Sequence, residues 1–289
     1  VGIALWESLM PRSPIPFLTM TVVHPDLKLR RSPAFRWGGW LMRRVRWPIL
    51  GLAIGLLIWW LVTTPAWHTG ITADFSPERS FVAGAQLVAS GALWPHILAS
   101  LRRVGVGLAA AAVIGIPTGL AIGLWQPLAQ GTSALFQFVR MISPLSWMPL
   151  AVMVFGIGDA PVYFLLTVAA VWPVLLNTAA GVQAVDRHWL LLSRSLCANR
   201  WETIVHVILP AIVPHLLVGL RLAMGVIWLV LVPAEMLGVS SGLGYFILDT
   251  RDRLAYGELM AAILIIGFIG YLLDKGLRSL QWSDLNGGQ

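Results

Sequence analysis

Two arginines inside otherwise apolar runs are the residues whose chemistry most needs an explanation. Arg140 and Arg221 both fall within hydrophobic segments, where a charge costs about 2.5–3.5 kcal/mol on insertion scales. Arg221 lies too deep in its segment for easy snorkelling. We therefore expect for it either a structural partner, such as a carboxylate, or a position along the path of an anion. For Arg140 we favour a position at the cytoplasmic interface, where a long side chain can reach water.

Polar side chains also gather around two prolines in the third apolar segment. Ser143, Ser146 and Trp147 lie beside or between Pro144 and Pro149. Prolines in a membrane helix free backbone carbonyls, and such an unwound backbone can line a cavity. This stretch is therefore a predicted wall of a solute pathway.

Asn177 is a lone amide in the next apolar segment. It either lines the same space or forms a hydrogen bond between helices. The candidate pathway-lining residues are Arg140, Ser143, Ser146, Trp147, Asn177 and Arg221. Their side chains suit binding and passage of a solute better than the breaking of bonds.

Signatures of catalysis are missing from the sequence. Lysine occurs only at Lys28 and Lys275, and no GxxxxGK motif followed by Ser or Thr exists, so a phosphate-binding lysine loop is excluded. The six histidines show no metal-binding spacing such as HExxH. The single cysteine, Cys197, excludes an internal disulfide. We expect no catalytic residue, no metal and no cofactor on this chain, and energy from a partner protein.

The composition is that of a membrane protein. Hydrophobic residues make up 57% of the 289 positions and charged residues 11%, whereas soluble proteins carry roughly 25% charge. The net charge of +7 comes almost entirely from arginine. These arginines cluster beside apolar runs, which is the orientation pattern of membrane proteins and not a nucleic-acid-binding patch.

Six hydrophobic segments are expected to cross the bilayer. They cover residues 47–64, 104–124, 134–157, 161–182, 211–233 and 259–273. A surface helix is expected outside the membrane near 81–89. Overlapping GxxxG patterns at Gly115, Gly119 and Gly123 predict close helix packing in preference to a ligand loop.

The charge distribution predicts the orientation. Six spans place both termini and the segment 186–210 on one side, and most Lys and Arg residues lie there, which marks it as the cytoplasm. Arg102 and Arg103 are the main exceptions. Residues 1–46 form a basic, proline-rich and largely disordered cytoplasmic tail, 47–280 the membrane domain, and 281–289 a short cytoplasmic C-terminal tail.

The long polar and apolar segment 186–210 organises the chain. A first amphipathic helix is expected over 189–196, a weak point at Cys197, and a second helix from Arg200 that ends at Pro210. Ordinary connections between helices need about two to eight residues. The length therefore favours docking on another protein, although packing on its own bundle is the alternative.

This segment resembles the EAA loop of binding-protein-dependent ABC importer permeases, a coupling helix that sits in a groove of the cytoplasmic ATPase. The match covers Leu191, Leu192, Ser193, Arg194, Ser195, Leu196, Cys197 and Ala198, and Leu209 with Pro210 closes the motif. The chain departs from the family pattern at two positions, because Leu191 replaces the usual acid and Cys197 the usual glycine.

Other stretches resemble the nitrate, sulfonate and taurine branch of the same family. They are residues 140–144, 147–149, 233–236 and 241–245. The resemblance implies an all-α, type I ABC importer permease with six transmembrane helices in a bacterial plasma membrane. It implies a homodimer with the path at the twofold axis, an ATPase subunit that binds ATP and Mg, and an extracytoplasmic binding protein that delivers a small, anionic solute.

The resemblance also assigns roles within the segment. Leu191, Leu192 and Leu196 would supply the buried contact with the ATPase, and Arg194 its polar rim. Three alternatives remain open, namely a membrane scaffold or receptor, a membrane-embedded enzyme, and one half of a heterodimeric permease. An enzyme would show converging titratable groups within the spans, and none are expected here.

Overall fold

The computed structural model describes residues 37–63 and 75–286, and all regular structure within them is helical. The chain divides into two units, residues 1–52 and 53–289. The first unit contributes the beginning of α1 (Trp37–Thr63), and the second holds everything that follows. Most of the predicted N-terminal tail and the last residues of the predicted C-terminal tail lie outside the described ranges.

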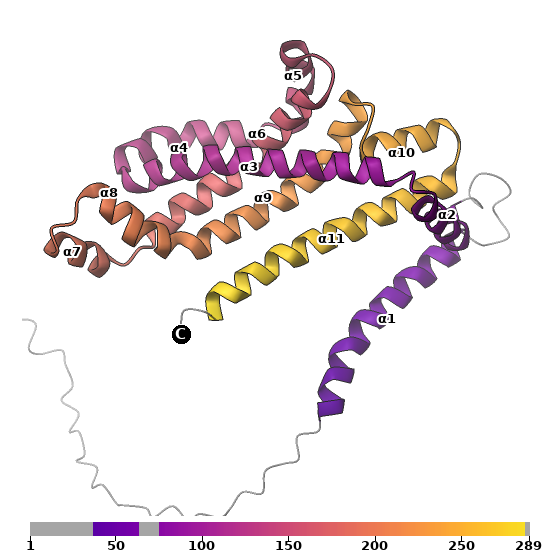
Figure 1. Cartoon of the computed structure of the whole chain (residues 1–289), viewed down its shortest axis with the longest axis horizontal. Helices are drawn as coiled ribbons and strands as arrows, with labels where there is room; N and C mark the ends of the chain where they lie inside the picture. Colours follow the sequence, from indigo (N-terminus) through magenta and orange to yellow (C-terminus); the bar gives the residue numbers. More distant parts are fainter. Residues whose placement is uncertain (1–36, 64–74, 287–289) are drawn as a thin grey trace, which may run out of the picture. The chain divides into compact units, whose positions relative to one another are not determined.

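The remaining helices follow in a single run along the chain (Figure 1). They are α2 (Pro77–Ser90), α3 (Trp94–Leu124), α4 (Gln126–Met141), the 3₁₀ turn η2 (Pro144–Trp147), α5 (Met148–Phe155), α6 (Asp159–Gln183), α7 (Arg187–Ser195), α8 (Arg200–Thr203), the π-helical turn η3 (Ile204–Ile208), α9 (Leu209–Gly238), α10 (Leu243–Asp252) and α11 (Tyr256–Asn286).

Four helices in the described ranges are long and apolar enough to cross a membrane. They are α3, α6, the continuous helix Arg200–Gly238 and the Tyr256–Ser279 part of α11. The predicted third span is bent by 84° between α4 and the η2–α5 pair, and it makes a fifth span if the pair crosses as one. The apolar part of α1, Leu50–Thr63, is shorter than the roughly 20 residues that a crossing needs. The all-α membrane fold is confirmed, while the count of six spans stays a prediction.

The core is built around α6, which packs against α3 on one side and α9 on the other (Figure 1). The GxxxG patterns of α3 lie in the first of these interfaces. A Cβ atom at Gly119 would come within 2.6 Å of the Leu175 carbonyl oxygen, and one at Gly123 within 2.6 Å of Val182 Cβ. The predicted close packing of these glycines is confirmed, because a larger side chain has no room there.

The second half of segment 186–210 differs from the prediction. A separate helix ending at Pro210 was expected, but α8, η3 and α9 form one continuous helix from Arg200 to Gly238. Pro210 lies in the first turn of α9, directly after the π-helical turn. A proline lacks an N–H and clashes with the carbonyl of the preceding turn. The wider π-helical turn relieves this conflict, so the helix passes the proline without ending.

Candidate functional site

The first helix of the predicted coupling segment is fixed at its start by Asp186. Its Oδ1 atom accepts a hydrogen bond from the backbone N–H of His188 at 2.9 Å and lies 2.8 Å from Nδ1 of the same histidine. The backbone hydrogen bond, followed by the side-chain one, lowers the pKa of Asp186 below its usual value. Asp186 is thus the N-cap of α7 and satisfies donors that the helix itself leaves free.

Cys197 ends the same helix in a left-handed conformation, with φ of 56°. The Cys197 N–H donates to the Arg194 carbonyl and the Ala198 N–H donates to the Ser193 carbonyl, both at 3.0 Å. This is the Schellman arrangement, in which glycine is the preferred residue at the left-handed position. The position at which the family motif has glycine is therefore one whose backbone favours glycine, although a cysteine occupies it here.

The chain re-enters a helix two residues later. The Asn199 side chain accepts from the Glu202 N–H, and the Glu202 carboxylate accepts from the Asn199 N–H, both at 2.8 Å. This reciprocal capping box starts the long helix that continues into α9. The turn between α7 and α8 is consequently fixed by a cap at the end of α7 and by a cap at the start of α8.

Three leucines of the segment point away from the protein's own core. Leu191, Leu192 and Leu196 are 48%, 49% and 73% exposed. Ser193 is buried instead, and its Oγ donates to the Leu190 carbonyl at 3.0 Å. The neighbouring side chains surround a hollow of about 620 Å³ lined by Trp189, Leu192, Ser193, Leu196, Ala198, Glu202, His206, Val207 and Ala211. The segment presents an apolar surface that the described residues leave uncovered.

The predicted pathway residues do not form one cluster. Ser143 and Ser146 are exposed at the bend between α4 and α5, and Trp147 is half-buried beside them. The Asn177 amide donates to the Pro173 carbonyl of its own helix at 2.8 Å, and not to another helix, while pore lining by this residue stays untested. Whether any of these residues contacts a solute stays a prediction.

Arg221 has the structural partner that was one of its two expected roles. Its Nε lies 2.9 Å from Oδ1 of Asp274 on α11, and Oδ2 of the same aspartate lies 2.9 Å from Arg278. The pair joins α9 to α11. Its position on an anion path remains the untested alternative.

Arg140 lies in the last turn of α4. Phe136, one helical turn before it, contacts Trp172 with 5.6 Å between the ring centroids, and Trp172 is in the central part of α6. Arg140 and these two aromatic residues share a hollow of about 330 Å³ between α4 and α6. The Arg140 side chain is exposed, and its expected position at the cytoplasmic interface stays a prediction.

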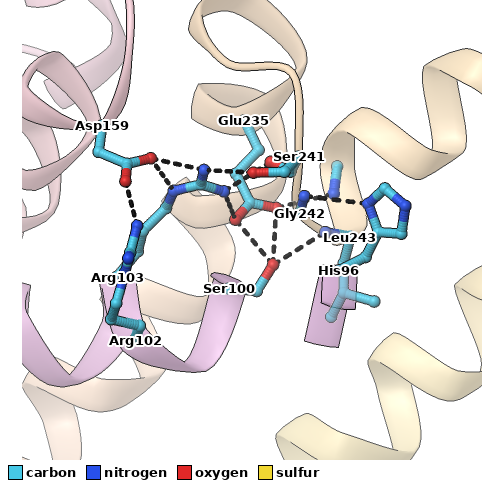
Figure 2. A network of polar contacts seen from close by, with 10 residues as sticks. His96, Ser100, Arg102, Arg103, Asp159, Glu235, Ser241, Gly242 and Leu243 are labelled. Carbon is cyan, nitrogen blue, oxygen red and sulfur yellow. Dashed lines mark hydrogen bonds and ion pairs between the residues drawn. The ribbon is translucent and has the colours of Figure 1, made fainter. Parts of the chain in front are cut away.

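A buried ionic network that the sequence analysis did not predict lies where α6 begins and α9 ends (Figure 2). Arg103 of α3 is 1% exposed, and Glu235 of α9 is fully buried. Arg103 Nη1 lies 2.7 Å from Glu235 Oε1, and Nη2 lies 2.6 Å from Oδ1 of Asp159, the first residue of α6. Arg102 also pairs with Asp159, and Arg103 donates to the Ser241 carbonyl at 2.7 Å. Three helices and the α9–α10 turn therefore meet at one guanidinium.

Glu235 accepts further hydrogen bonds that satisfy both of its oxygens. The Ser100 hydroxyl lies 2.7 and 2.9 Å from Oε1 and Oε2, and the Gly244 N–H donates to Oε2 at 2.8 Å. Ser100 in turn accepts from the Leu243 N–H at 2.8 Å. Gly242 has φ of 115°, and a Cβ atom there would overlap Arg103 and Glu235. Gly242 and Gly244 thus fit against a buried ion pair, and Gly242 is seen beside it in Figure 2.

This network bears on two sequence interpretations. Arg102 and Arg103 were expected at the outer end of a span that begins at residue 104; the helix α3 itself begins earlier, at Trp94, and includes both arginines. No usable combination of titratable groups was expected within the spans, and Arg103, Asp159 and Glu235, which converge here, lie just outside the predicted spans 104–124, 161–182 and 211–233. The available signal was that each is a charged residue at the edge of an apolar run. Their distance apart in sequence hid the pairing.

Comparison with solved structures identifies the fold. The fold matches that of a chain in inward-facing structures of the MetNI methionine ABC transporter, with a TM-score of 0.55 and 18% identity, over 66% of this chain and 94% of that one. At this identity the likeness concerns the fold alone. An all-helical fold of this kind is that of a type I ABC importer permease.

Sequence comparison then gives the family. Residues 92–280 match the binding-protein-dependent transport system inner membrane component family, and the chain belongs to it. The chain is 36% identical to the taurine transport system permease protein TauC of Escherichia coli K12, over 86% of this chain and 92% of TauC. It is 35% identical to the bicarbonate transport system permease protein CmpB of Synechococcus elongatus, over 81% of this chain and 87% of CmpB. It is also 36% identical to the nitrate import permease protein NrtB of a Synechocystis strain, over 64% of this chain and 68% of NrtB. The protein is a multi-pass permease subunit of an importer in the inner membrane.

Proposed function

We propose that this permease forms a homodimer whose twofold axis holds the path of a small anion, and that it is driven by two copies of a separate cytoplasmic ATPase. The ATPase binds ATP and Mg, and this chain binds neither. An extracytoplasmic binding protein delivers the solute. Both termini and the segment 186–210 lie in the cytoplasm. The named relatives, which serve taurine, bicarbonate and nitrate, support the anionic class of the solute.

The uncovered apolar surface of the coupling segment carries the ATPase assignment. Leu191, Leu192 and Leu196 are exposed on a turn that capping interactions hold rigidly at Asp186, Cys197 and Asn199. An apolar surface that is already ordered before binding loses little conformational entropy when it docks. Because α8 is continuous with α9, a shift of the docked segment is passed to a membrane helix. ATP binding can thereby favour one of two arrangements of the bundle, provided that the ATPase binds the two arrangements with different affinity.

The test is co-purification of the ATPase with the wild-type permease and with Leu192→Glu. The substitution places a charge on the exposed leucine surface of the coupling segment. We expect the ATPase to be lost while the variant stays folded in the membrane. Leu254→Glu is the matched control, because Leu254 is 66% exposed in the α10–α11 turn, and we expect it to retain the ATPase. Equal retention by all three proteins would place the docking surface elsewhere.

Composition of the same purified complex tests the homodimer. Intact-mass measurement should give two copies of this chain and two of one ATPase. A second kind of membrane subunit in the complex would establish a heterodimer instead. Uptake of labelled taurine, nitrate and bicarbonate into liposomes holding the complex and its binding protein then tests the solute class, and transport of a cation or a neutral sugar would overturn it.

A further inference from the structure

The hollow between α4 and α6 combines an arginine with neutral polar groups along the second half of α6. Its polar lining comes from α4 and consists of Thr132, Ser133, Gln137 and Arg140, with Gln183 at the end of α6. Ser133, Gln137 and Arg140 are spaced by four and three residues, which puts them on one face of the helix. The opposing wall is mainly apolar and includes Trp172, Leu175, Leu176 and Ala179.

Arg140 differs from two other arginines of the bundle. Arg103 pairs with Asp159 and Glu235, and Arg221 pairs with Asp274. Arg140, in contrast, has an exposed side chain and forms no ion pair or hydrogen bond with any residue in the parts of the chain that the structure describes. The hollow is the place where a counter-ion can come from outside the chain.

The rest of α4 shows which face meets lipid or a partner. Leu135, Phe138 and Met141 are exposed apolar side chains, and the polar residues Ser133, Gln137 and Arg140 are exposed as well but line the hollow. The helix therefore has a polar side along the hollow, which suits a helix beside a water-filled space in a membrane protein. The volume of about 330 Å³ holds roughly ten water molecules at ~30 Å³ each. That is enough for a small anion with part of its hydration shell.

We propose that the hollow between α4 and α6 is an anion-binding station on the transport path, with Arg140 as the counter-ion and Gln137 as a hydrogen-bond donor. This inference deepens the proposed function and rests on it. The guanidinium suits an oxygen-bearing anion, such as a sulfonate, nitrate or bicarbonate, because it offers several N–H donors in one plane. The amide of Gln137 adds a neutral donor that orients the anion without a second charge. The occupant is a soluble anion in transit and not the phosphate of a lipid.

The single cysteine makes a direct test possible. Cys197→Ser gives a chain free of cysteine, into which Gln137→Cys is introduced inside the hollow. Leu135→Cys is the matched control on the exposed apolar face of the same helix. The measured quantity is the rate of modification by an anionic methanethiosulfonate reagent that carries a sulfonate, and by a cationic one that carries a trimethylammonium group. The complex with its ATPase is used in membranes throughout.

We expect the anionic reagent to modify Gln137→Cys about 10-fold faster than the cationic one, because a positively charged cleft raises the local concentration of anions. Leu135→Cys should react slowly with both reagents. Addition of taurine, nitrate or bicarbonate should slow the anionic reaction at position 137. Arg140→Gln should abolish the preference for the anion, and Arg140→Lys should keep most of it.

Three outcomes would overturn the inference. Equal slowness at positions 137 and 135 would mean that lipid fills the hollow. A disulfide between two copies of Gln137→Cys would mean that a second copy covers it. Fast reaction with both reagents, unaffected by Arg140→Gln, would mean a wet space without anion preference. Retention of the ATPase is measured on the same preparations and on the wild-type chain, because Cys197 lies in the coupling segment. A chain that keeps the ATPase and lacks the anion preference loses only this inference, whereas loss of the ATPase from the wild-type chain counts against the proposed function.

Discussion

Arg103 Nη1 and Glu235 Oε1 lie 2.7 Å apart where both side chains are removed from solvent. The two residues are 132 positions apart in the sequence and join α3 to the end of α9. The carboxylate is also saturated by Ser100 and by the Gly244 N–H. A buried ion pair repays its desolvation only when its hydrogen bonds are satisfied in this way. The pair therefore fixes one geometry for this end of the bundle.

Glu235→Gln should destabilise the protein strongly, because it leaves the Arg103 guanidinium buried without its full counter-charge. Removal of one partner from a buried pair costs about 3–5 kcal/mol. The measurement is thermal unfolding of the purified protein in detergent. Asp252→Asn is the control, since the Arg251–Asp252 pair is exposed and an exposed pair contributes about 0–1 kcal/mol. A similar melting temperature for both variants would contradict the role assigned to the pair.

Cys197→Gly should stabilise the turn after α7 by about 1 kcal/mol, because a residue other than glycine pays a cost in the left-handed conformation. Thermal unfolding and hydrogen exchange across α7 are the measurements. Ser195→Gly, at the last residue of α7, should instead destabilise by about 0.5 kcal/mol, since glycine has a lower helix propensity than serine. If both glycine substitutions destabilise, then the left-handed geometry is not strained by the cysteine.

Gly119→Ala should separate α3 from α6, since the added methyl group would meet the Leu175 carbonyl and Thr178. Overpacking of this kind costs about 1–3 kcal/mol. The yield of folded protein after size-exclusion chromatography and its melting temperature are the readouts. Gly105→Ala in the same helix has open space around the new methyl group and should behave as wild type. Normal behaviour of Gly119→Ala would show that the two helices can move apart freely.

Acid should loosen the start of α7, because the pKa of Asp186 in the folded protein is lowered by its hydrogen bonds with His188. A lowered pKa stabilises the folded helix above the ordinary pKa of the aspartate, and this contribution is lost as the pH falls through the lowered value. Hydrogen exchange of α7 relative to Asp186→Asn, measured at each pH, tests the effect. Asparagine keeps the cap without titrating, so the ratio should rise toward low pH. A ratio that is independent of pH would contradict it.

Local chemistry made much of the fold predictable. Apolar length located the main membrane helices, the spacing of Gly115, Gly119 and Gly123 indicated a close helix contact, and the two prolines marked the break between α4 and α5. The coupling segment could be found because its mixed polarity interrupts apolar runs. Each of these signals is contained within a short stretch of sequence.

The remaining features depend on contacts between distant residues. Asp159 and Arg103 are 56 positions apart, and no local sequence pattern at either residue identifies the other as its partner. Pro210 indicated a helix end because an ordinary α-helix cannot accept it there. The π-helical turn at Ile204–Ile208 removes that conflict, and the sequence carries no plain sign of such a turn. The hollow that Arg140 lines also depends on how α4 lies against α6.

The continuity of the helix from Arg200 to Gly238 has a mechanical consequence. Its 39 residues correspond to a rod of about 58 Å at 1.5 Å per residue. One end of the rod begins at the Asn199 cap beside the exposed leucines, and the other end carries Glu235, to which Arg103 is clamped. No break in the helix separates the two ends. A tilt of the helix at the Asn199 capping box would therefore move its other end, which carries Glu235. The Arg103–Glu235 ion pair would resist that movement and so limit the angle through which the helix can tilt.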